Sequence, residues 1–186
     1  VLCGYAHARF LFDRYNTVRI TTVPMFLFKL VTPARLGAAM LRITIFAVGK
    51  LKEQFWKDAV AEYLKRLGGY AKIEVRELPD SNAEKEAAAL LSALPERGPI
   101  ILMDIRGKET SSEGLAQKID TYALNSDSHI SFIIGGSDGV TKEVKQRATE
   151  RISFGPITLP HNLARVVLLE QIYRAFKIIR HEPYHK

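Results

Sequence analysis

Apolar residues recur along residues 41–179 with two alternating periods. Short β-branched runs such as "RITIFAV" and "PIILMDI" are typical of buried strands. Segments between them, such as "LKEQFWKDAVAEYLKRL", place apolar residues three or four positions apart, as an amphipathic helix does. The pattern predicts strands at residues 41–49, 71–78, 99–105, 129–136 and 151–154, and helices at 51–67, 81–94, 111–124 and 161–179, with a short helix before the fifth strand. This alternation indicates an α/β fold with a mostly parallel sheet and helices on both faces.

Ligands of such sheets bind in loops outside the carboxyl ends of the strands. Three predicted loops lie there, after Gly49, after Ile105 and after Ile134. The third, within "SFIIGGSDGV" (residues 131–140), lacks both the Gly-x-Gly-x-x-Gly fingerprint and the Gly-Lys-Ser/Thr ending of phosphate loops. The sequence alone therefore leaves two readings, a ligand-binding loop and a glycine-rich turn that starts a helix.

Residues typical of helix starts indicate where two of the predicted helices begin. Ser81, with Glu84 three residues later, predicts a capping box at the start of the helix at 81–94. His161, which follows Pro160, is expected to serve in the cap or first turn of the last helix rather than in catalysis. Its apolar stripe is wider than one face against a sheet requires, so the helix is either deeply buried or also packed on a second subunit.

The last helix and the chain end carry most of the candidate polar chemistry. Glu170 and Arg174 are four residues apart, which predicts an ion pair. A basic side, expected to be solvated or to contact phosphates, comprises Arg165, Arg174, Lys177 and Arg180. The terminal "HEPYHK" puts an aromatic residue beside cationic groups, which is either a surface for stacking a nucleobase or a polar chain end.

Composition narrows the class of protein. The 186 residues, 47% of them hydrophobic, suffice for one domain, and no apolar run approaches the roughly 20 residues of a membrane span. The single cysteine excludes a disulfide framework and fits a cytoplasmic setting, and the histidines are not spaced as metal ligands, so no metal is expected. A net charge of +7 favours an RNA or DNA partner.

Residues 1–39 differ from the remainder of the chain. They hold +4 of the net charge and show no clear period. They read as a transit-type leader, as translated upstream sequence or a cloning remnant, or as a genuine appendage. The second explanation is favoured, with Met40 as the natural start and residues 40–186 as the folded domain.

Three stretches resemble one family. "AVGKLKEQFWKDAVAEYLKRL", "FIIGGSDG" and "SFGPITLPHNLARVVLLEQIYRAFKIIRHEPYHK" are similar to the RlmH family, the ribosomal RNA large-subunit methyltransferases H of the SPOUT superfamily. The resemblance covers residues 40–186. It implies a homodimer through the C-terminal helix and a C-terminal trefoil knot, a rare exception to the rule against threaded chains. It also implies transfer of a methyl group from S-adenosylmethionine to N3 of pseudouridine 1915 in 23S rRNA on the assembled ribosome.

The resemblance also implies site residues. The cofactor site comprises Met103, Gly135, Phe154, Gly155, Pro156, Ile157, Thr158 and Leu159. The chemistry is expected at Tyr184, His185 and Lys186 over the cofactor of the same or a partner subunit, with His185 as proton acceptor. Two alternatives stay open, another SPOUT-type RNA methyltransferase and an RNA-binding α/β module without catalysis.

Overall fold

A computed structural model describes residues 40–124 and 129–184 of the chain. The expectation for residues 1–39 lies outside the described residues. The ten elements follow the predicted order: β1 (Arg42–Val48), α1 (Gln54–Leu67), β2 (Lys72–Leu78), α2 (Ala83–Ala93), β3 (Ile100–Glu109), α3 (Ser112–Leu124), β4 (His129–Ile134), α4 (Lys142–Arg147), β5 (Glu150–Ser153) and α5 (His161–Ile179). The hydrophobic periods therefore predicted each element, although β3 continues four residues further than expected.

The five strands form one parallel sheet in the order β2-β1-β4-β3-β5. The register of β1 against β4 pairs Arg42 with His129, and β3 shifts register against β5 between Met103 and Lys108. At Gly107 an added Cβ would lie 2.8 Å from backbone atoms of Arg151 and Ile152. A glycine there lets the extended end of β3 lie directly against β5.

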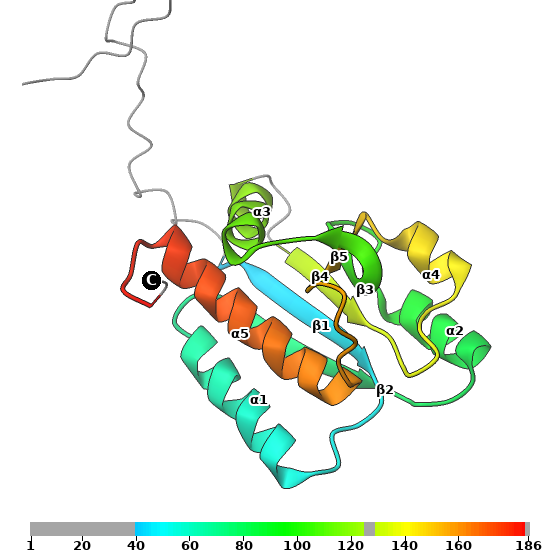
Figure 1. Cartoon of the computed structure of the whole chain (residues 1–186). Helices are drawn as coiled ribbons and strands as arrows, with labels where there is room; N and C mark the ends of the chain where they lie inside the picture. Colours follow the sequence, from blue (N-terminus) through cyan, green and yellow to red (C-terminus); the bar gives the residue numbers. More distant parts are fainter. Residues whose placement is uncertain (1–39, 125–128, 185–186) are drawn as a thin grey trace, which may run out of the picture. The chain divides into compact units, whose positions relative to one another are not determined.

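Helices cover both faces of the sheet, which confirms the predicted fold class. The larger apolar core lies between the sheet and α1, α3 and α5, and the smaller one lies between the sheet and α2 and α4. In Figure 1, α5 crosses one face of the sheet with α1 on one side and α3 on the other. Strand residues alternate between the two cores, as the pleat requires: Ile43 and Ile45 belong to the first core, and Phe46 and Val48 to the second.

The position of α5 accounts for its wide apolar stripe. Leu168, Leu169 and Ile172 are fully buried within a single chain, because the helix packs on the sheet and on two neighbouring helices at once. Deep burial is therefore sufficient to explain the width, and packing against a second subunit stays a prediction.

The predicted cap of α2 is wrong by one residue. Asn82, not Ser81, is the N-cap, and its side chain accepts a hydrogen bond from the Lys85 backbone N–H at 3.0 Å. The Ser81 backbone N–H instead donates to the buried carboxylate of Glu86 at 2.9 Å. Both residue types cap well, and the amide oxygen of asparagine occupies the position here. None of the helices in the described ranges is both long and apolar enough to cross a lipid bilayer.

Candidate functional site

A cavity of about 550 Å³ opens at the carboxyl edge of the sheet. Its walls come from residues 103–105 in the middle of β3, from the end of β4 with the loop that follows it, from Lys145 of α4, and from the chain between β5 and the first turn of α5. This volume falls within the range of about 300–1,000 Å³ that is typical of small-molecule sites. The edge is also where ligands of parallel sheets bind.

The cavity gathers most of the residues that the resemblance places in a cofactor site. Seven of these eight line it: Met103, Gly135, Phe154, Gly155, Ile157, Thr158 and Leu159. Pro156, which is exposed, does not line the cavity. The structure therefore brings together positions up to 56 residues apart in the sequence, and their binding of a cofactor stays a prediction.

The loop after β4 has glycines at positions 135, 136 and 139, and each position excludes a larger side chain for its own reason. A Cβ on Gly135 would lie 2.7 Å from Val140 Cγ1, and one on Gly136 would lie 2.8 Å from the Glu86 carboxylate. Gly139 has open space but a φ of +78°, and its N–H donates to the Gly136 carbonyl at 3.1 Å. The glycines thus close a tight turn. The turn lines the cavity and precedes α4, so the two readings of this loop are compatible.

The opposite wall is shaped by a turn at residues 153–155. The buried Ser153 hydroxyl donates to the Gly155 carbonyl at 2.9 Å and accepts from the Gly155 N–H at 3.1 Å. Gly155 has a φ of +110°, which a residue with a side chain rarely adopts. Beyond this turn Ile157 is 75% exposed, and together with Ile105 it gives the cavity an apolar rim.

A fully buried arginine ties α5 to the edge that carries the cavity. Arg165 donates to the Val48 and Gly49 carbonyls, each at 2.7 Å, and to Glu77 Oε1 at 3.0 Å. Burial lowers the pKa of Arg165, and the Glu77 carboxylate opposes that effect. The expectation of a solvated basic side is therefore wrong for Arg165, because strand-end carbonyls and one carboxylate compensate a guanidinium inside the protein.

The other members of that expected basic side are also engaged within the chain. Arg174 pairs with Glu170 at 2.7 Å, as the spacing predicted, and Lys177 pairs with Glu182 at 2.6 Å. The Arg180 guanidinium lies 4.4 Å from the centroid of the Tyr70 ring. The basic side is thus not a free cationic face.

Among the cavity-lining residues outside the predicted set, three have ionisable side chains: Asp104, Lys145 and His161. Asp104 directly follows the apolar part of β3, and a charged residue after a buried run at this edge of the sheet was a readable signal. Lys145 carried no signal, because an exposed lysine on a short helix is ordinary. His161 occupies the first turn of α5 as predicted, but Pro160 is the N-cap and α5 has no side-chain cap hydrogen bond.

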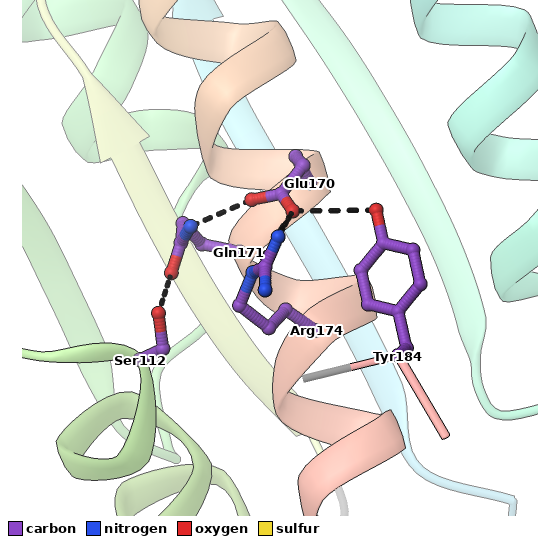
Figure 2. A network of polar contacts seen from close by, with 5 residues as sticks. All are labelled: Ser112, Glu170, Gln171, Arg174 and Tyr184. Atoms are coloured by element: carbon purple, nitrogen blue, oxygen red, sulfur yellow. Dashed lines mark hydrogen bonds and ion pairs between the residues drawn. The ribbon is translucent and has the colours of Figure 1, made fainter. Parts of the chain in front are cut away.

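Of the predicted catalytic residues, only Tyr184 lies within the described range. Figure 2 shows its hydroxyl pointing toward Glu170, with Oε1 3.4 Å away. Its ring packs edge-on against Tyr173, with 5.0 Å between centroids, and under the Arg174 guanidinium at 4.9 Å. Glu170 also accepts from Gln171 at 2.6 Å, and the Gln171 amide accepts from Ser112 of α3 at 2.7 Å.

Tyr184 therefore packs over the second half of α5, whereas the cavity adjoins its first turn. His161 and Ala164 line the cavity, and Ala164 and Glu170 are separated by about 9 Å of helix rise. In this arrangement the chain end does not bring Tyr184 into its own cavity. His185 and Lys186 lie outside the described residues.

A second contact holds the chain end against the helices. Glu182 accepts from the Tyr70 hydroxyl at 2.5 Å and from Lys177 Nζ at 2.6 Å. The hydrogen bonds from Lys177 and Tyr70 lower the pKa of Glu182. Nowhere in the described ranges do three or more histidine, cysteine, aspartate or glutamate side chains gather as a metal site would require.

Comparison with known proteins adds two findings. A family model described as "Predicted SPOUT methyltransferase" matches residues 41–185, which include every element of the fold and every residue of the cavity. Among solved structures, a probable methylase family protein from Haemophilus influenzae Rd KW20 is similar at 12% sequence identity and a TM-score of 0.48. The match covers 78% of this chain and 70% of that one, and a likeness this distant supports no inference about activity.

Proposed function

Because the chain belongs to the SPOUT methyltransferase family, a family of S-adenosylmethionine-dependent RNA methyltransferases, we propose that it methylates N3 of pseudouridine 1915 in 23S rRNA. The observation that carries the proposal is the cavity at the carboxyl edge of the sheet. It gathers seven of the eight residues that the RlmH resemblance assigns to the cofactor. The family model supports the reaction class, and the three RlmH-like stretches support the substrate.

The cavity suits the nucleoside part of S-adenosylmethionine. Met103 and Phe154 offer apolar surface to the faces of an adenine ring. The turn at residues 153–155 and the chain after it offer backbone N–H and C=O groups, which can hydrogen-bond the edge of the base. When bound, the cofactor would supply an activated methyl group, so the protein's main task is to hold the nucleophile in line with it.

The chain end is the proposed source of proton chemistry. N3 of pseudouridine is a weakly acidic imide nitrogen, so a base that accepts its proton assists methylation. We assign that role to His185, with Tyr184 and Lys186 beside it. Since Tyr184 packs away from the cavity of its own chain, we expect these three residues to act at the cavity of a second subunit.

A homodimer through α5 is part of the proposal. Leu163 and Val167 are four residues apart on α5, remain half-buried, and belong to neither apolar core. Glu170 and Arg174 continue the same face of the helix. A second copy of α5 packed there would bury the two apolar side chains.

The family membership also supports a knotted C-terminal region.

The test is methyl transfer to ribosomes that lack the modification. Purified protein, radiolabelled S-adenosylmethionine and ribosomes that carry pseudouridine 1915 should give methyl incorporation, which mass spectrometry of the digested rRNA places on N3. Free 23S rRNA should be a poor substrate, because residues 40–186 carry a net charge of only +3.

The control is a ribosome with uridine at position 1915. Equal incorporation into both ribosomes would overturn the proposed substrate and leave another RNA methyltransferase of the family. A parent protein that does not bind S-adenosylmethionine in a calorimetric titration would overturn the proposal as a whole and favour an RNA-binding module without catalysis.

A further inference from the structure

We infer that Asp104 and Lys145 form a subsite for the amino-acid tail of the cofactor, with Asp104 binding its ammonium group and Lys145 its carboxylate. The inference rests on the proposed function, because it takes S-adenosylmethionine as the ligand of the cavity. Its basis is the distribution of charge along the cavity wall. Among the described residues that line the cavity, Asp104 and Lys145 are the two that carry a formal charge.

Both residues lie on the side of the sheet that carries α4. Met103 and Ile152 pack with the core under α5, and Asp104 and Arg151 alternate with them along their strands. The contact between Asp104 Oδ2 and Arg151 Nη1, at 3.4 Å, places the two side chains on the same face. Lys145 comes from α4, whose Val144 belongs to the second core. The cavity therefore has charged side chains toward α4 and apolar walls toward α5.

The two charges are incompletely used within the chain. The Asp104 carboxylate is 14% exposed and accepts the Arg106 backbone N–H at 3.0 Å, and its contact with the half-exposed Arg151 is long. A carboxylate has about four acceptor positions, so at least two remain. The Lys145 backbone N–H donates to the Thr141 carbonyl within α4, but its side-chain ammonium, which has three donors, makes no hydrogen bond or ion pair with any residue in the described ranges.

A carboxylate with free acceptor positions and an ammonium without a partner suit a zwitterionic ligand. A phosphate-bearing ligand would meet the Asp104 carboxylate with like charge, which disfavours nucleotides in this cavity. The α-amino acid tail of S-adenosylmethionine carries an ammonium and a carboxylate on one carbon atom. With the adenine on the apolar side, the tail points toward α4.

Calorimetric titration of single variants with four ligands tests the subsite. The variants are Asp104→Asn and Lys145→Met. The matched controls are Asp138→Asn and Lys142→Met, which change a nearby aspartate and lysine outside the cavity lining. The ligands are S-adenosylmethionine, S-adenosylhomocysteine, which keeps both tail charges without the sulfonium, 5′-methylthioadenosine, which has no tail, and decarboxylated S-adenosylmethionine.

Loss of a charged hydrogen bond should weaken binding by about tenfold or more. Asp104→Asn should weaken S-adenosylmethionine and S-adenosylhomocysteine alike and leave 5′-methylthioadenosine unchanged. Lys145→Met should weaken the same two ligands and leave the decarboxylated compound unchanged. Neither control should change any of the four affinities.

Each other pattern overturns the assignment. If Asp104→Asn weakens 5′-methylthioadenosine equally, Asp104 binds the ribose hydroxyls. If it weakens the two sulfonium compounds, S-adenosylmethionine and its decarboxylated form, but not S-adenosylhomocysteine, Asp104 faces the sulfonium. If Lys145→Met binds every ligand as the parent does, the lysine has no part in the site. Because the Lys145 side chain is exposed, this variant should fold as the parent does. A parent that binds none of the ligands removes the proposed function instead, so the two failures are distinguishable.

Discussion

Replacement of Arg165 by methionine should destabilise the domain more than any other single change to its charged groups. Three charged hydrogen bonds are lost, two to the carbonyls of Val48 and Gly49 and one to Glu77. At about 1.5–3 kcal/mol each their gross value is about 5–9 kcal/mol. Relief of the desolvated guanidinium offsets part of this, so we expect the free energy of unfolding to fall by about 3–5 kcal/mol.

The assay is urea denaturation followed by the fluorescence of Trp56, which is the single tryptophan of the chain and packs against the larger core. At about 2–4 °C per kcal/mol for a chain of this size, the thermal midpoint should fall by about 6–20 °C. Protomer concentration is held constant, because dimerisation would shift the midpoint.

Glu77→Gln is the matched comparison. The carboxylate is 32% exposed and glutamine keeps an acceptor oxygen, so the expected loss is smaller, about 1–2 kcal/mol. A loss below about 1 kcal/mol for Arg165→Met would refute the reasoning about buried carbonyls. Equal losses in the two variants would show that the ion pair, and not the strand-end carbonyls, dominates.

Three further outcomes are expected. Gly139→Ala meets no atom but forces a residue with a side chain to a φ of +78°, so unfolding in urea should show a loss of about 1–2 kcal/mol. Because its partners lower the pKa of Glu182, the ionised carboxylate stabilises the docked chain end above the ordinary glutamate pKa. That stabilisation is lost as the pH falls through the lowered pKa of Glu182. In the same pH range the hydrogen-exchange protection of residues 178–184 should fall. The Glu182→Gln variant should lack this protection already at neutral pH. Burial, aided by the hydrogen bond to Glu150, raises the pKa of Tyr122 to about 12, so stability should decline as the pH rises above about 10, where the unfolded tyrosine ionises. Tyr122→Phe should remove the last component of an absorbance titration at alkaline pH and reduce that decline, part of which remains because burial also raises the pKa values of Tyr63 and Tyr70.

The sequence predicted the elements well because their hydrophobic periods are regular over many residues. It predicted less of the site, because the contacts there depend on the local conformation of loops and turns and not on a repeating pattern of apolar residues. The proximity of Gly135 to Val140 and the turn made by Ser153 depend on distances below 3.5 Å, which no periodicity encodes. Asp104 was overlooked although it directly follows the buried part of β3, close to where ligands of such sheets bind.

Arg165 shows a different limit of sequence reasoning. Arginine is almost never fully buried unless it is paired, so a helix position among other basic residues indicates a solvated side. The compensating groups lie at the ends of β1 and β2, about 90–120 residues earlier in the chain. Only the packing of α5 against that edge of the sheet brings them within hydrogen-bonding distance.

The order of the strands has a consequence for how the protein folds during synthesis. The edge of β1 that pairs with β4 has no partner until residues 129–134 have been made, so the first half of the chain leaves the ribosome with an open apolar strand edge. Pairings this distant in sequence form slowly, which leaves that edge exposed to aggregation for longer. The cavity is assembled later still, because its last wall and the Arg165 contacts require α5. A ligand of the cavity can therefore stabilise only the nearly complete chain, and a nascent chain that stalls before α5 gains nothing from it.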